Sequence, residues 1–318
     1  MIVSKERLLS SAADTDFRPA MLEKVFYLLA LLEDILAHPR LKGKLALKGG
    51  TALNLFVFDI PRLSIDIDLN YIAHANWGEM KADRPVVEEA IRSILKKHAL
   101  PIKREAPDHA GGKWVIGYQS ALGGTGNLQI DLNFLLRAPL WQVITTNSKS
   151  IASQQVLQVP VLDSHELFAG KLSALMSRQA SRDLFDTFNL LTKTSFDFAK
   201  LRLALVIYGA MNPKDWRQCS PETIGYTVKE IKEKLLPLLR NNELKPSNDL
   251  AAWAEELLST CIEKLNNFFP LAENETEFIT QVREKGVIKP DLITDDQSLQ
   301  DILATHPSLL WRATKARQ

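Results

Sequence analysis

Hydrophobic positions in the first half of the chain switch between helical spacing and alternation. Residues 18–37 carry apolar residues at helical spacing, and Pro19 suits the first turn of that helix. Alternating or short apolar runs then follow, a pattern typical of strands. We expect helices at 18–37, 52–57 and 85–98, and strands at 45–47, 64–71, 102–106, 113–120 and 127–135. Glycines within residues 123–126 predict a hairpin turn between the last two strands.

After residue 160 the pattern becomes almost wholly helical. Asp163 and Ser164 are good caps for a helix at 165–178, and Ser181 for a second helix at 182–191. Further helices are predicted at 199–209, 226–240, 249–269 and 273–285. The sequence therefore predicts an α+β fold, in which a mixed-sheet domain with helices (1–160) precedes an all-helical C-terminal domain (161–318).

Composition excludes several classes of protein. With 46% hydrophobic residues over 318 positions, the chain is neither disordered nor fibrous. Its 39 basic and 38 acidic residues nearly cancel, which excludes a nucleic-acid binder that relies on bulk positive charge. Two cysteines are too few for a disulfide framework or a cysteine zinc site. Any ligand must therefore be recognised locally.

The chain shows no targeting or membrane signal. Its first residues carry charges of both signs, unlike a signal peptide, and no apolar run reaches the roughly 20 residues of a membrane span. We therefore expect a cytoplasmic protein without a membrane partner.

The segment Lys48-Gly49-Gly50-Thr51 leads from a strand into a helix. Two glycines at such a turn let backbone N–H groups approach an anion, and Thr51 adds a hydroxyl. By itself, a turn of this composition is more often only a turn.

Asp66 and Asp68 strengthen the interpretation of this segment as part of a binding site and not only a turn. Residues two apart on a strand share a face, so both carboxylates project together while Ile67 and Leu69 face the core. Like charges this close need a counter-charge, for which Mg²⁺ (or Mn²⁺) suits the oxygen ligands. The alternative is a solvated polar face.

Asp131 has the same position in an alternating strand, between Ile130 and Leu132. If that strand lies beside residues 64–71, Asp131 completes a carboxylate trio. Such a trio can hold metal ions that clamp a triphosphate and help deprotonate an attacking hydroxyl. Taken alone, Asp131 would more often be an ordinary surface residue.

A third cluster lies in the helical half. If residues 171–189 form one continuous helix, Lys171, Arg178 and Arg182 fall within a narrow stripe with Asp186 close to it. A cationic stripe beside an acid suits phosphates. A solvated helix face with an ordinary Arg–Asp pair explains the spacing equally well.

These motifs together carry a family resemblance. The run Gly-Gly-Thr-Ala-Leu from Gly49, followed by Arg62-x-Ser64-x-Asp66-x-Asp68, resembles the first motif of AbiEii/AbiGii-type (MenT-like) nucleotidyltransferase toxins. Two later runs, Lys-Leu-x-Ala-Leu-x-x-Arg from residue 171 and Arg-Asp-x-Phe-Asp from residue 182, resemble the family's lysine and Arg-Asp motifs. The matches span residues 48–191, and nothing after residue 192 matches a motif.

The resemblance implies a fold like that of the DNA polymerase β nucleotidyltransferases. It assigns metal binding to Asp66 and Asp68, with Asp131 as the third acid, and catalysis to these three and Lys171. It assigns nucleotide binding to Gly49, Gly50, Thr51, Arg62, Ser64, Lys171, Arg178, Arg182 and Asp186.

The implied activity is metal-dependent transfer of NMP from an NTP to an acceptor hydroxyl, at the 3′ end of tRNA. The protein would be the toxin of a toxin–antitoxin pair, with a cognate antitoxin protein. Two alternatives stay open: a non-catalytic module that binds a nucleotide or partner, and transfer to a protein hydroxyl. The basic tail at 311–317 could contact RNA, although a frayed terminus is the simpler expectation.

Overall fold

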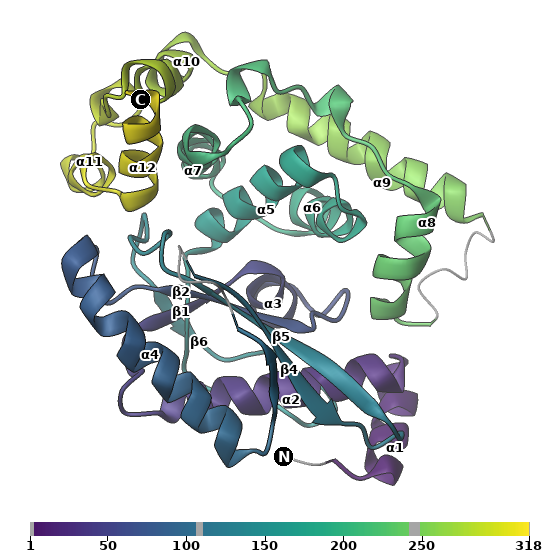
Figure 1. The fold of residues 1–318 in the computed structure, drawn as a ribbon. Helices are drawn as coiled ribbons and strands as arrows, with labels where there is room; N and C mark the ends of the chain where they lie inside the picture. Colours follow the sequence, from purple (N-terminus) through teal and green to yellow (C-terminus); the bar gives the residue numbers. More distant parts are fainter. Residues whose placement is uncertain (1–2, 106–110, 242–248, 318) are drawn as a thin grey trace. The chain divides into compact units, whose positions relative to one another are not determined.

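A computed structural model of the chain describes residues 3–105, 111–241 and 249–317 (Figure 1). The chain forms two compact units and passes between them several times. The first unit comprises Met1–Arg137, Val143–Leu162 and Pro237–Lys245, and the second comprises Ala138–Gln142, Asp163–Leu236 and Pro246–Gln318. The domain limits 1–160 and 161–318 stay a prediction, because compactness alone does not show that either part folds by itself.

The first unit is built on a seven-stranded mixed sheet with the order β3-β4-β5-β2-β1-β7-β6. The strands are β1 (Leu45–Lys48), β2 (Asp66–Tyr71), β3 (Ile102–Arg104), β4 (Gly111–Gln119), β5 (Thr125–Asn133), β6 (Ile144–Thr146) and β7 (Val159–Val161). β2 pairs with β5 and β1 with β7 in parallel, whereas the other neighbours are antiparallel. The mixed sheet and the hairpin between β4 and β5 confirm the sequence prediction.

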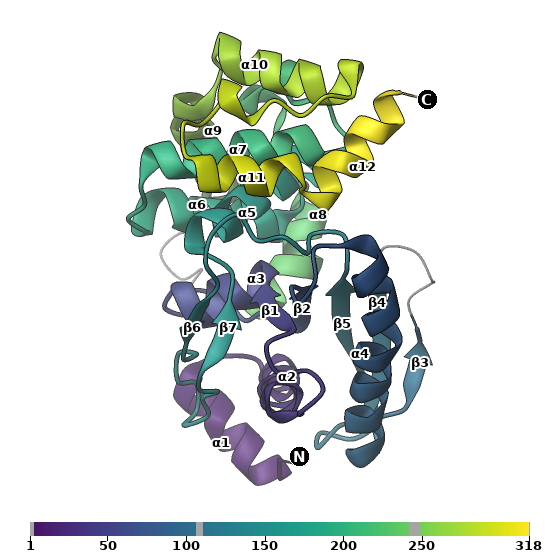
Figure 2. The same ribbon diagram turned by 90° about the vertical axis from the view of Figure 1, so that its left-hand side faces the viewer.

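Two long helices cover the apolar face of this sheet. The helical segments of the first unit are α1 (Lys5–Thr15), α2 (Pro19–Ala37), α3 (Gly49–Ala52), the π-helical turn η1 (Leu53–Val57) and α4 (Trp77–Lys97). Ile67, Leu69 and Tyr71 on β2 are buried, and the Tyr71 hydroxyl donates to Asp83 of α4 at 2.9 Å. α2 packs against both β2 and α4 (Figure 2). Consequently, the polar residues of β2 lie on the opposite face from α2 and α4.

Helix α4 begins earlier than the sequence predicts. The expected start at Pro85 is wrong, because Asn76 caps the helix by accepting from the backbone N–H groups of Gly78 and Glu79. Pro85 lies inside the helix, where it removes one backbone hydrogen bond. Met80 and Val87 are both buried, so the packed face of α4 continues across the proline and offsets that loss.

In the first unit, the sequence did not predict α1, β6 and β7. Strands of three residues are too short to show alternation. The strand predicted at 102–106 ends at Arg104, and residue 106 lies outside the described residues.

The second unit is helical in the described residues. Its α-helices are α5 (Ser164–Arg178), α6 (Ser181–Lys193), α7 (Phe198–Met211), α8 (Val228–Glu230), α9 (Leu250–Leu265), α10 (Glu273–Thr280), α11 (Gln297–Ala304) and α12 (Pro307–Ala316). α5 packs on α6 and α7, and α6 packs on α9. None of the helices within the described ranges is long and apolar enough to cross a membrane.

Two expectations for the helical half are wrong. Ser181 does not cap α6: the N-cap is Ala180, and the backbone N–H of Ser181 donates to the Glu230 carboxylate at 2.9 Å. The single helix expected at 226–240 is instead a series of short segments, α8, η4 (Ile231–Leu235) and η5 (Leu236–Leu238). Pro237 lies in the last of these, and a proline disfavours helical conformation at the residue before it.

Candidate functional site

Three aspartates share one face of the sheet. Asp68 on β2 and Asp131 on β5 are direct register partners on neighbouring parallel strands. Asp66 lies two residues before Asp68 and so projects from the same face. All three are half-buried, whereas the intervening Ile67 and Ile130 are buried on the other face. The prediction that the two aspartate-bearing strands are neighbours is confirmed.

Two lysines extend this arrangement into a row of charges. Lys48 on β1 is the register partner of Asp68, and Lys113 on β4 is the partner of Asp131. Opposed residues on neighbouring strands lie on the same face, with Cβ atoms roughly 5 Å apart. The row across β1, β2, β5 and β4 therefore reads Lys, Asp, Asp, Lys. The sequence assigns no function to either lysine, because only the strand order brings them to the aspartates.

The charges of this row affect the pKa of Asp131. Burial raises the pKa of the Asp131 carboxyl, the positive charge of Lys48 lowers it, and the negative charge of Asp68 raises it. Lys113 has a smaller lowering effect, and the net result is a pKa above the ordinary value. The two facing carboxylates thus repel each other despite the flanking lysines.

A hard divalent cation fits the chemistry of these donors. Carboxylate oxygens are the ligands that Mg²⁺ prefers, and the Asp68–Asp131 pair concentrates negative charge at one place. Within the part of the chain that the structure describes, no three His, Cys, Asp or Glu side chains are grouped closely enough to hold a metal ion. Metal binding by all three aspartates stays a prediction.

The glycine turn lies directly against the Asp68 side chain. Gly49 has a left-handed backbone with φ +70°, and a Cβ atom there would overlap the Asp68 carboxylate. A Cβ on Gly50 would come within 3.0 Å of Ser64 Oγ and 3.2 Å of Arg62 Nη2. The structure therefore brings together five of the predicted residues: the two glycines, Arg62, Ser64 and Asp68.

Thr51 fastens this turn to β2. Its side chain is fully buried, and its hydroxyl lies 3.0 Å from Ser64 Oγ and donates to the carbonyl of Asp66. Arg62 is also buried and donates to the carbonyl of Leu63 at 2.8 Å. These contacts hold the turn in place, and the predicted contacts of Thr51, Arg62 and Ser64 with a nucleotide stay predictions.

The remaining predicted residues form a second group, in the helical unit. Lys171 Nζ lies 2.8 Å from Asp183 Oδ1 and 2.9 Å from Asp186 Oδ2. Arg178 Nε lies 2.6 Å from Asp183 Oδ2, although the Arg178 side chain is 63% exposed. Lys171 and both aspartates are buried. Burial alone would raise the pKa of Asp183, but the charges of Lys171 and Arg178 outweigh it and hold that pKa well below its ordinary value.

The continuous helix assumed for this group is wrong. α5 ends at Arg178, Gln179 adopts a left-handed conformation with φ 53°, and α6 begins at Ser181. This break allows Lys171 and Arg178 to meet at Asp183 instead of lining one stripe with Arg182. The Arg-Asp motif contains Asp183 but does not indicate its function. The break between the helices brings Asp183 to both Lys171 and Arg178.

The two groups of residues match one known family. The sequence profile described as "Nucleotidyl transferase AbiEii toxin, Type IV TA system" matches residues 30–267, which include every candidate site residue. The chain belongs to this family. It is therefore a nucleotidyltransferase of a toxin family from type IV toxin–antitoxin systems. The motifs predicted the nucleotidyltransferase and the toxin family, and the profile adds the type of system.

A solved structure of a nucleotidyltransferase toxin has a similar fold. The chain is similar to MenT4, a nucleotidyltransferase toxin from Mycobacterium tuberculosis H37Rv, with a TM-score of 0.54 and 14% sequence identity. The similarity covers 94% of this chain and 96% of MenT4, so the AbiEii-type chain shares that fold over nearly its whole length. No curated protein matches the sequence significantly.

Proposed function

We propose that this AbiEii-type protein transfers NMP from an NTP to the 3′ hydroxyl of an RNA, with the acceptor end of tRNA as the target. In this proposal it acts as a toxin that a cognate antitoxin protein neutralises. The observation that carries the proposal is the opposition of Asp68 and Asp131 on neighbouring strands, with the backbone of Gly49 against the Asp68 carboxylate.

Asp66, Asp68 and Asp131 would hold Mg²⁺ or Mn²⁺, which when bound offsets the negative charge of the triphosphate. Asp131 would help activate the acceptor hydroxyl, through the metal or as a base, because its register position places it beside Asp68. Lys48 and Lys113 flank this position and attract an anionic substrate to it.

The glycine turn has a steric function in this proposal. Because Gly49 and Gly50 lack side chains, their backbone can approach the side chains of Asp68 and Ser64 closely, which places the N–H groups of the turn beside the proposed metal ligands. Thr51 keeps that backbone fixed through its contacts with Ser64 and Asp66. A fixed turn binds phosphate with a smaller loss of conformational entropy than a flexible one.

Lys171, Arg178 and Arg182 would neutralise phosphate charge, and Asp186 would shape the nucleotide pocket. Arg178 is best suited to meet a phosphate, since its side chain is largely exposed. Lys171 would contribute positive potential while it holds Asp183 and Asp186 in position.

The test is a label-transfer assay with each of the four NTPs, radiolabelled at the α-phosphate. Products are separated into RNA, protein and small-molecule fractions. We expect label in RNA for the wild type, none for Asp68→Asn, and wild-type labelling for the control Asp14→Asn, an exposed residue of α1. Wild-type labelling by Asp68→Asn would contradict the mechanism, and label in protein would contradict the RNA acceptor. Tight NTP binding without pyrophosphate release would indicate a non-catalytic module.

A further inference from the structure

Helix α12 presents an aromatic and cationic surface. Trp311 is 42% exposed, and Lys315, one helical turn later, places its Nζ atom 3.9 Å from the centre of the indole ring. The neighbouring Leu310 is 45% exposed. The sequence from Pro307 to Arg317 contains no Asp or Glu. This part of the chain therefore combines an exposed aromatic ring with uncompensated positive charge.

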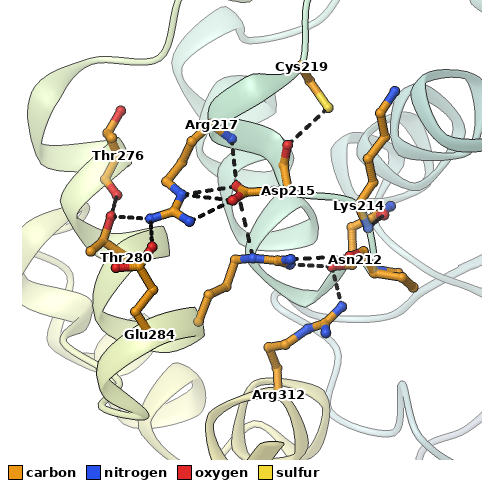
Figure 3. A network of polar contacts seen from close by, with 11 residues as sticks. Asn212, Lys214, Asp215, Arg217, Cys219, Thr276, Thr280, Glu284 and Arg312 are labelled. Carbon is orange, nitrogen blue, oxygen red and sulfur yellow. Dashed lines mark hydrogen bonds and ion pairs between the residues drawn. The ribbon is translucent and has the colours of Figure 1, made fainter. Parts of the chain in front are cut away.

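This helix is fixed to the rest of its unit, contrary to the expectation of a frayed terminus. The Arg312 guanidinium donates to the carbonyl of Asn212 at the end of α7 (Figure 3). Arg283 donates to the same carbonyl at 2.6 Å, and Arg317 Nη2 donates to the carbonyl of Gly286 at 2.6 Å. Trp311 and Lys315 therefore lie on a helix that is already ordered. A ligand that binds there does not have to offset the entropy cost of ordering this helix.

The charges around α12 are largely paired with one another: Arg283 lies 4.0 Å from Asp215, and Lys285 lies 3.2 Å from Glu277. The π-helical turn η7 (Gln281–Lys285) packs against α12 and brings Arg283 and Lys285 to it. Its one acid, Glu284, is paired with Arg217 at 2.5 Å (Figure 3). Among the residues that the structure describes, no carboxylate forms an ion pair with Lys315. The charge of Lys315 is therefore available to an external anion.

An exposed indole beside a lysine matches single-stranded nucleic acid. Lys315 covers one face of the ring, so a base would stack on the other face while the cation contacts the adjoining phosphate. Such stacking tolerates any base. A partner with an acidic or purely apolar surface would use only one of these two features.

We propose that Trp311 and Lys315 on α12 form an RNA-docking surface, on which a base of a single-stranded acceptor segment stacks against Trp311 and its phosphate contacts Lys315. This inference rests on the proposed function, because it supplies a binding surface for the RNA acceptor. It also gives a function to residues outside the 30–267 range that the family profile matches.

The test measures binding of a fluorescent single-stranded RNA by anisotropy, without NTP, at several salt concentrations. Trp311→Ala should weaken binding on the order of tenfold at every salt concentration, because stacking is not ionic. Trp311→Phe should retain most of the affinity and so controls for folding. Lys315→Gln should reduce the slope of log affinity against log salt by about 0.7, the loss of one phosphate contact to a single strand.

Matched controls lie in the sheet unit. Trp77 is 61% exposed, and among the described residues no Lys or Arg stands over its ring, so Trp77→Ala should leave RNA binding unchanged. Lys42 is exposed as well, and Lys42→Gln should leave the salt slope unchanged.

Wild-type affinity and salt slope in both Trp311→Ala and Lys315→Gln would overturn the inference while RNA labelling by the wild type still supported the proposed function. Label found only in protein would instead refute the proposed acceptor, in a separate measurement. Variants that bind RNA normally but escape neutralisation by a co-expressed antitoxin would overturn the inference in favour of a protein partner.

Discussion

Asp68 and Asp131 lie opposite each other on the parallel strands β2 and β5, although distant segments of the chain supply them. Like charges at opposed positions destabilise a sheet. Burial adds to this cost because it disfavours the ionised carboxylate, and it raises the pKa of Asp131 for the same reason. Lys48 and Lys113 at the two ends of the row compensate only part of the repulsion. The pair therefore destabilises the folded protein, and the proposed catalytic function would explain why it is present. Its effects on stability and on activity can be measured separately.

Replacing Asp131 by Asn should remove this repulsion while it preserves the shape of the side chain. We expect the free energy of unfolding to rise by up to about 1 kcal/mol. NMP transfer should fall by on the order of a hundredfold or more, because the residue proposed to activate the acceptor hydroxyl is lost. Urea unfolding and the label-transfer assay measure the two effects.

Removal of the positive charge of Lys48 supplies the control for this prediction. Lys48→Met removes a compensating charge and should lower the free energy of unfolding in the wild type. The loss should be smaller in the Asp131→Asn background, where Lys48 still faces Asp68 but no longer acts on a charge at position 131. Equal losses of stability in both backgrounds would show that Lys48 and Asp131 do not interact.

Gly49 and Gly50 form a matched pair for testing the turn. Gly49→Ala should destabilise the protein by about 1–3 kcal/mol, because φ is +70° and the new methyl group meets the Asp68 carboxylate. Gly50→Ala adds contacts of 3.0 Å to Ser64 and 3.2 Å to Arg62 without that strain, so its effect should be smaller. Urea unfolding of both variants compares them, and an equal loss would disprove the special geometry of Gly49.

Lys171 should be critical for the stability of the helical unit. Lys171→Met leaves Asp183 and Asp186 buried without their shared cation, which should cost about 3–5 kcal/mol. Arg178→Met removes a largely exposed partner of Asp183 and should cost less than about 1 kcal/mol. Thermal or urea unfolding ranks the two, and a larger effect at Arg178 would refute this assignment.

Glu166 should make stability depend on pH near neutrality. It is buried on α5, accepts from the Leu140 backbone N–H at 3.0 Å and from the Tyr208 hydroxyl at 3.1 Å, and burial raises its pKa from 4.5 to about 7. The folded protein therefore keeps a proton that the unfolded chain releases at lower pH. This contribution to stability is complete below the unfolded pKa and is lost as the pH rises through about 7.

One pKa unit corresponds to about 1.4 kcal/mol, so the loss should amount to roughly 3 kcal/mol in all. Glu166→Gln has no proton to release and should show a flatter stability profile than the wild type. Urea unfolding at about pH 5 and about pH 8 compares the two proteins. Parallel profiles would mean that Glu166 does not titrate in this range.

Local patterns predicted most of the regular elements. The helix α2, the strand β2 and the hairpin between β4 and β5 were found because periodicity and turn residues are properties of short segments. Short strands such as β6 and the true start of α4 were missed, because their formation depends on packing and capping partners. The same division applies to the candidate site. Alternation placed Asp66 and Asp68 on one face of a strand, but Lys48, Lys113 and Asp183 gained their significance only from neighbours distant in sequence.

The sequence by itself determined the family, the facing of Asp66 and Asp68, and the glycine turn, because motif spacing, strand alternation and the absence of a side chain are local properties. Only the tertiary structure decided that Asp131 stands opposite Asp68 and that Lys171 is held between two buried aspartates. Strand order and the angle between successive helices depend on the packing of the whole unit. Charges brought together in that way interact strongly at short range, whatever their separation along the chain.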